Sequence, residues 1–248
     1  AVTSMRLFIS LVLTFSLVGC GPVNEVDPTA DWDVERFYSE ARAELAKKNY
    51  LTAIEYYETL ESRFPFGKYA TQAQIDVAYA YFKFNEPDSA ITALDRFIKL
   101  HPRHESVDYA YYLKGLVNFE RGGTILDLLV ERDVSEFDRN LILNAYNDFK
   151  ILLQRFPSSE YALDAKKRMI YLRNELARSD YQIANYYATR DAWVAVANRT
   201  KFILQNYQGS SVIRPTLALQ LQAYQNLGME DMARDTQRII DLNYKQGS

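Results

Sequence analysis

Small and large apolar residues recur in a fixed order along the chain, at spacings that place them on one face of a helix. One stretch runs Phe37, Ala41, Tyr50, Ala53, Tyr57, Leu60 and Pro65, and the next runs Ala78, Tyr81, Ala90, Leu94, Phe97 and Pro102. In each, the second small residue lies 12 positions before a proline, and the same spacing joins Ala145 to Pro157. A small residue lets two antiparallel helices approach, and proline cannot continue a helix. The pattern therefore predicts one antiparallel helix pair per unit.

Two later units lack the terminal proline but keep a polar turn followed by a small residue, at residues 191–195 and 229–233. Neither Gly nor Pro occurs between Ser158 and Gln208, which predicts one long helix over about 159–188 and a shorter helix after it. No stretch alternates apolar and polar residues between hairpin turns, so strands are not expected. We therefore expect an all-α protein of about ten helices in five pairs.

This arrangement resembles the tetratricopeptide (TPR) repeat, in which small residues, aromatics and a terminal proline recur in roughly 34 residues. The resemblance implies a TPR solenoid, with units 1–3 in residues 34–158 and units 4–5 in residues 159–245. Partners normally dock on the concave face of a solenoid, which the first helix of each pair lines.

The third unit departs from this spacing. Gly115 suits the small position of its first helix but lies 30 residues before Ala145, whereas Ala41 and Ala53 are 12 apart. About 18 residues are therefore inserted, at about 121–139, with an apolar patch at 125–130 and a charge-dense end at 133–139. Two interpretations stay open: the apolar residues fold back onto the neighbouring unit, or the insert contacts a partner.

The first residues are typical of an export signal. Met5 and Arg6 precede an apolar run over 7–18, which is too short to span a bilayer of about 30 Å. Leu17-Val-Gly-Cys20 resembles a bacterial lipobox, which implies cleavage of residues 1–19 and a diacylglycerol on Cys20. Residues 20–33 then form a tether, and Gly21 in place of Asp implies the periplasmic face of the outer membrane. The alternative is an ordinary signal peptide with a chance cysteine.

Composition and charge limit the classes of function that the chain could have. The formal net charge of −3 disfavours nucleic acid as a partner, and the single cysteine cannot form an intramolecular disulfide. His101 and His104 flank Pro102 in a turn, where a metal site is not expected. The sequence also lacks a phosphate-binding Gly-rich loop and a Gly-x-Ser-x-Gly nucleophile elbow. We therefore expect no cofactor, no metal and no catalysis, but a protein that binds other proteins.

Two candidate surfaces follow from the repeat register. The first is a set of concave, first-helix positions suited to capturing a peptide, namely Tyr38, Arg42, Gln72, Tyr79, Lys83, Tyr109 and Tyr112. The rings offer apolar area with a polar tip and the cations suit a peptide carboxylate, although any one tyrosine could equally be interhelical packing. The second surface is Trp193, Asn198 and Arg199, where an arginine replaces the aromatic or small residue of the repeat and therefore needs a partner.

Four stretches go beyond a generic TPR: ESRFPFGKYA (61–70), LDRFIKLHP (94–102), DYAYYLKG (108–115) and AWVAVANR (192–199). With the lipobox they resemble the BamD family, the TPR lipoproteins of the outer-membrane β-barrel assembly machinery. The resemblance implies that units 1–3 bind C-terminal signals of unfolded outer-membrane proteins. It also implies docking of Arg199 on an acidic residue of a BamA POTRA domain, and contact with accessory Bam lipoproteins. Asp133, Asp138 and Arg139 match the family loosely, and a periplasmic TPR lipoprotein that scaffolds cell-wall enzymes or other folded partners remains the alternative.

Overall fold

The computed structural model describes residues 27–121 and 139–244, and these residues form ten α-helices and no strand. The proposed signal peptide, Cys20, the start of the tether, and Asp133 and Asp138 of the insert lie outside the described residues. The helices are α2 (Val34–Ala46), α3 (Tyr50–Arg63), α4 (Lys68–Lys83), α5 (Pro87–Leu100), α6 (Val107–Arg121), α7 (Arg139–Arg155), α8 (Ala162–Ala188), α9 (Trp193–Asn206), α10 (Ile213–Asn226) and α11 (Glu230–Tyr244). The prediction of an all-α TPR solenoid with about ten helices in five pairs is confirmed.

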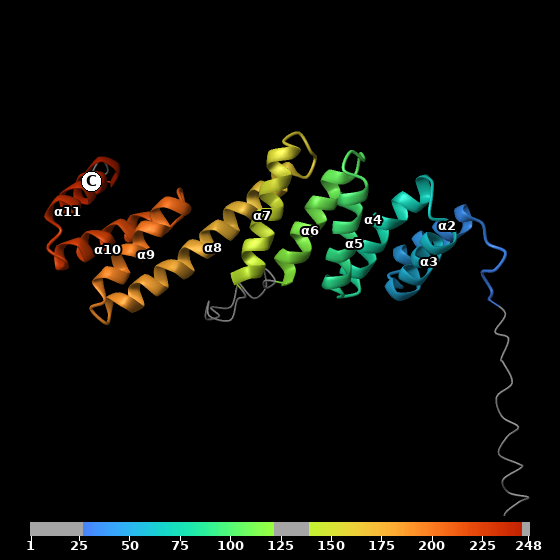
Figure 1. Cartoon of the computed structure of the whole chain (residues 1–248), viewed down its shortest axis with the longest axis horizontal. Helices are drawn as coiled ribbons and strands as arrows, with labels where there is room; N and C mark the ends of the chain where they lie inside the picture. Colours follow the sequence, from blue (N-terminus) through green and yellow to red (C-terminus); the bar gives the residue numbers. More distant parts are fainter. Residues whose placement is uncertain (1–26, 122–138, 245–248) are drawn as a thin grey trace, which may run out of the picture.

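Each helix packs mainly on the helix before it and the helix after it, so the pairs follow one another along the long axis of the molecule (Figure 1). The first helices of neighbouring pairs also touch directly, α2 on α4 and α4 on α6. One continuous face of the N-terminal half is therefore built from first helices. We call it the first-helix face.

The same backbone turn joins the two helices in four of the five pairs. Lys48, Asn85, Asp191 and Gly228 take the left-handed conformation at φ values between 56° and 68°. The residue after each donates its N–H to a carbonyl five residues back, as Asn49 does to Glu44 at 2.9 Å and Glu86 to Tyr81 at 2.9 Å. This is a Schellman cap, which satisfies carbonyls at the end of the first helix and reverses the chain.

The small positions are where the paired helices approach most closely. Ala53, Ala90 and Ala145 are fully buried, as the spacing to the prolines predicts, and so is Ala41. In the third pair Gly115 takes this place, and a β-carbon added there would lie 2.6 Å from Cε1 of Phe149 on α7. The prolines at 65, 102 and 157 fall in the turns between pairs, immediately after α3, α5 and α7 end.

The long helix is α8, with 27 residues, and it begins three residues later than the predicted 159. Figure 1 shows it running obliquely from the stack of α2 to α7 towards α9, α10 and α11. Its buried residues belong to three successive core clusters, with Leu172 in the first, Leu176 in the second and Ala184 in the third. The N-terminal and C-terminal units therefore share one uninterrupted helix.

Candidate functional site

The first-helix face carries all seven residues that the sequence singled out for peptide binding. Tyr38 and Arg42 lie on α2, Gln72, Tyr79 and Lys83 on α4, and Tyr109 and Tyr112 on α6. Arg42 and Lys83 are exposed, and the other five side chains are partly buried. Each ring therefore packs on a neighbour with one part and meets solvent with the other.

Asp76 on α4 organises the first end of this face. Its Oδ2 accepts hydrogen bonds from the hydroxyls of Tyr38 at 3.0 Å and Tyr57 at 3.4 Å, and its Oδ1 accepts one from Nε2 of Gln72 at 3.0 Å. The guanidinium of Arg42 lies 5.9 Å from the centre of the Tyr38 ring. Burial raises the pKa of the Asp76 carboxyl, although the hydrogen bonds from Gln72 and Tyr38 oppose the shift. The same burial, followed by the charge of Asp76, raises the pKa of Tyr38 to about 12.

Aromatic rings continue the face towards α8. Nζ of Lys83 lies 5.7 Å from the Tyr79 ring centre. Tyr161, just before α8, stacks on Tyr112 with centroids 4.7 Å apart and an interplanar angle of 18°, and it packs on Tyr109 at 5.4 Å. The result is a ladder of half-exposed rings across three units.

A second carboxylate lies at the end of this ladder, next to Tyr112. Oδ2 of Asp164 on α8 accepts a hydrogen bond from the Tyr112 hydroxyl at 2.7 Å and from Nε of Arg168 at 2.6 Å. The first-helix face therefore ends, on each side, in a carboxylate held by a tyrosine, with an arginine nearby. Such a surface offers flat apolar area, ring hydroxyls and cationic groups, which suits an extended peptide with aromatic side chains.

Asp76, Tyr161 and Asp164 also belong to this face but were not predicted from the sequence. A signal for Asp76 was present, because it is an acidic residue between two apolar residues, Ile75 and Val77, that are both buried. It also follows Gln72 by four positions, which places the two on one face of the helix. Asp164 likewise precedes its partner Arg168 by four positions, but the contacts of Tyr161 and Asp164 with Tyr112 join residues about 50 positions apart and left no signal in the sequence.

In the second candidate surface, the side chains of Trp193 and Asn198 lie apart from that of Arg199. Trp193 and Asn198 line a hollow of about 500 Å³, which Leu227 also lines. Trp193 is partly buried against the third core cluster, whereas Asn198 is exposed. Arg199 is not among the residues that line the hollow, because neighbouring positions on a helix point about 100° apart.

Arg199 has a partner within the chain, which was not predicted from the sequence. Its Nη1 lies 2.9 Å from Oδ1 of Asp180 on α8, and Nη2 of Arg139 lies 2.9 Å from Oδ2 of the same carboxylate. Nη2 of Arg139 also donates to the hydroxyl of Tyr207 at 3.0 Å. Asp180 is fully buried. We call Arg139, Asp180, Arg199 and Tyr207 the arginine cluster.

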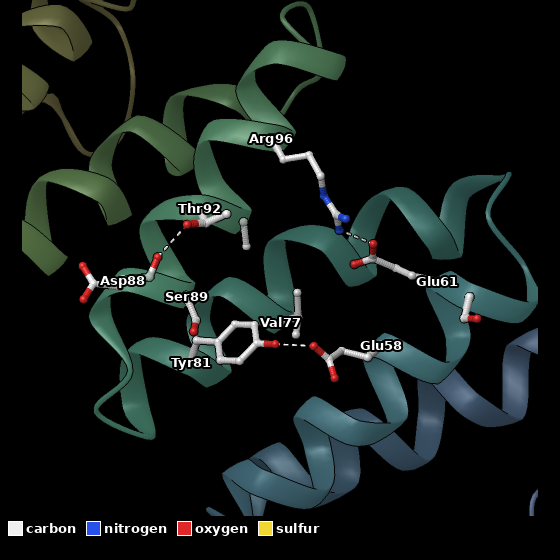
Figure 2. A pocket seen from close by; sticks show the side chains of 10 residues that line it. Glu58, Glu61, Val77, Tyr81, Asp88, Ser89, Thr92 and Arg96 are labelled. Carbon is white, nitrogen blue, oxygen red and sulfur yellow. Dashed lines mark hydrogen bonds and ion pairs between the residues drawn. The ribbon is translucent and has the colours of Figure 1, made fainter.

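A further groove of about 650 Å³ lies between α3, α4 and α5 (Figure 2). Figure 2 shows the Tyr81 hydroxyl bonded to Glu58 and Arg96 paired with Glu61 across it. Burial raises the pKa of Glu61, and Arg96 opposes the shift. Arg96 and Glu61 are thus paired with each other, whereas Asp88, which also lines the groove, pairs with Arg121.

The two histidines take part in local contacts in their turn. Nε2 of His101 lies 3.1 Å from Oε1 of Gln74, and Nδ1 of His104 accepts the backbone N–H of Ser106 at 3.2 Å. Across residues 27–121 and 139–244, no group of three or more His, Cys, Asp or Glu side chains is placed to hold a metal ion. Within the same ranges, no helix combines the length and the apolar character needed to cross a membrane.

Comparison with known proteins shows the family of the chain. Residues 30–239 match the YfiO family, described as outer membrane lipoprotein. The outer membrane protein assembly factor BamD of Neisseria meningitidis serogroup A is 41% identical over 243 residues, covering 96% of this chain and 91% of that protein. The proteins of the same name from Vibrio cholerae, at 39% identity with 95% and 97% covered, and from Xylella fastidiosa, at 36% with 97% and 83% covered, are similar along their length. The chain belongs to the BamD family of outer membrane lipoproteins.

Proposed function

We propose that this chain is a non-catalytic scaffold and substrate-recognition subunit of the outer-membrane protein assembly complex. Its relatives are named outer membrane protein assembly factors, and the TPR-type solenoid offers extended surfaces for binding proteins. Lipidation of Cys20 would hold it on the periplasmic face of the outer membrane. A thioether-linked diacylglycerol supplies two chains, which stable anchoring needs.

The observation that carries substrate recognition is the ladder of half-exposed rings on the first-helix face. An unfolded β-barrel protein ends in a strand that alternates apolar and polar side chains, with a terminal carboxylate. We propose that its aromatic side chains pack on Tyr79, Tyr109 and Tyr112, and that Lys83 or Arg42 pairs with its carboxylate. Both cations are exposed and have no ion pair among the described residues.

A peptide-binding experiment tests this proposal. A fluorescent peptide ending in an aromatic residue should bind the chain, and a photo-crosslinker on it should label α2, α4 and α6. Tyr79→Ala and Lys83→Ala should each weaken binding at least threefold. Tyr186→Ala is the matched control, since this tyrosine is 52% exposed but lies on α8 away from the ladder. Labelling confined to units 4 and 5, or equal loss in the control, would refute the assignment.

For the C-terminal units, we propose docking on a POTRA domain of BamA through Trp193, Asn198 and Arg199. The hollow beside Trp193 would receive an apolar side chain, and Arg199 would contact an acidic residue. Arg199→Glu should weaken association with the purified POTRA domains in calorimetry, and wild-type affinity would reject the assignment. Depletion of the chain should also lower outer-membrane porin levels, whereas a scaffold for cell-wall enzymes would leave them unchanged.

A further inference from the structure

The arginine cluster holds more positive charge than its carboxylate neutralises. Asp180 supplies one negative charge, and Arg139 and Arg199 supply two positive charges, so these three side chains carry a net charge of +1. The carboxylate is completely buried, whereas the side chains of Arg139 and Arg199 are 38% and 34% exposed. The buried acid therefore pairs with two arginine side chains that are both partly exposed.

Each guanidinium has N–H groups that make no hydrogen bond among the described residues. A guanidinium carries five N–H groups, and among the described residues Arg139 uses Nη2 alone, for Asp180 and Tyr207, while Arg199 uses Nη1 alone, for Asp180. The two groups are bonded to opposite oxygens of one carboxylate, so they are held close together. Their orientation is also fixed by contacts from three helices, α7, α8 and α9.

From this geometry we infer that the docking surface binds a carboxylate of its partner with a pair of guanidiniums, Arg139 and Arg199, which buried Asp180 positions. The inference rests on the proposed docking of the C-terminal units and adds two residues to it. Arg139 is the second contact residue, and Asp180 is a positioning residue that does not touch the partner. The partner group is a side-chain carboxylate, because two guanidiniums side by side match its two oxygens.

Preorganisation is the advantage of this arrangement. A free arginine loses rotamer entropy when it binds a partner, whereas Arg139 and Arg199 are already held. The net charge of +1 attracts an acidic group. The negative charge of buried Asp180 offsets the repulsion between the two guanidiniums.

The decisive variant is Asp180→Asn, because charge and positioning predict opposite results. The amide raises the net charge to +2, which alone would tighten binding of an acidic partner. However, the NH2 group of the amide is a hydrogen-bond donor and cannot accept from a guanidinium. Only one of the two arginines therefore keeps its hydrogen bond to residue 180. We expect affinity for the BamA POTRA domains to fall at least threefold. Affinity equal to or tighter than wild type would refute the positioning role.

The second arginine is tested by a double-mutant cycle. Arg139→Gln and Arg199→Gln should each weaken binding at least fivefold, and the double variant should lose less than the product of the two, since both bind one carboxylate. Arg139→Lys should also weaken binding, because a lysine cannot hold Asp180 and a partner carboxylate with a planar fork. Arg178→Gln is the control, since this exposed α8 arginine pairs with Glu175. Thermal unfolding of each variant establishes that it is folded.

The outcomes separate this inference from the proposed function. If Arg199→Gln weakens binding and Arg139→Gln and Arg139→Lys do not, the paired contact is wrong while the docking surface stands. If neither arginine matters, the docking assignment itself is wrong.

Discussion

Gly115→Ala tests whether the close approach of α6 and α7 is what the glycine provides. The added β-carbon would lie 2.6 Å from Cε1, 2.8 Å from Cδ1 and 2.9 Å from Cζ of Phe149. An ordinary carbon–carbon contact is about 3.5–4.0 Å, so the ring would have to move by about 1 Å. Phe149 is fully buried, and its ring packs 6.2 Å from that of Tyr112. The ring therefore has no open space to enter.

Two opposing effects set the size of the change. Overpacking a well-packed core costs about 1–3 kcal/mol, and a contact about 1 Å too close to a fully buried ring falls in the upper part of that range, at about 2–3 kcal/mol. Replacing glycine by alanine within a helix gains about 1 kcal/mol, so the net loss is about 1–2 kcal/mol. At roughly 2–4 °C per kcal/mol for a chain of this size, the midpoint of thermal unfolding should fall by about 2–8 °C.

Circular dichroism at 222 nm, a helix band, follows the unfolding. The control is the pair Phe149→Leu and Gly115→Ala/Phe149→Leu. The smaller side chain makes room for the β-carbon, so the double variant should be more stable than the sum of the two single effects. A Gly115→Ala variant as stable as the wild type would mean that α6 and α7 separate at no cost, and the packing argument would be wrong.

Three further changes probe other features. Lys48→Gly should stabilise the chain by about 0.5–1 kcal/mol in urea denaturation, because Lys48 has a φ of 65° that glycine adopts without strain, and an unchanged midpoint would contradict this. Because burial raises the folded-state pKa of Asp76 above the ordinary 3.8, its contribution to stability is largest at low pH and is lost as the pH rises through the raised pKa. The unfolding free energy of Asp76→Asn should therefore rise relative to that of wild type as the pH increases above about 4, and parallel pH profiles would refute the shift. Phe66→Ser should change the unfolding free energy by less than about 0.5 kcal/mol, because Phe66 is 89% exposed, and a larger loss would reveal a contact not present in the structure.

Helix pairing was predictable from the sequence because its causes are local. A small residue 12 positions before a proline fixes where two helices touch and where the second one ends, and Ala53, Ala90 and Ala145 are buried accordingly. The long helix was predictable for a similar reason, since nothing interrupts residues 158–188. The assignments of Cys20 and the peptide-binding and docking residues remain predictions.

The arginine cluster was not predictable, because it depends on which distant residues meet. Arg139 and Asp180 are 41 residues apart, and Asp180 and Arg199 are 19 apart. The spacing placed Arg199 at an apolar position of the repeat and so predicted that its charge needs a partner. Only the packing of α8 on α7 and α9 shows that the partner includes Asp180. The Schellman turns were hidden too, because Lys48, Asn85 and Asp191 stand where glycine usually marks such a turn.

One helix, α8, determines how far apart the two proposed binding surfaces lie. It carries Asp164 near its start and Asp180 two-thirds along, and at about 1.5 Å per residue these two positions are roughly 24 Å apart along the axis. Helix α8 would thus act as a spacer of defined length and phase between the two proposed surfaces. Inserting 18 residues, which is five full turns, would lengthen that span by about 27 Å and leave the relative orientation of the two surfaces about the helix axis unchanged. Inserting two residues would barely lengthen it but would turn one surface by about 200° relative to the other.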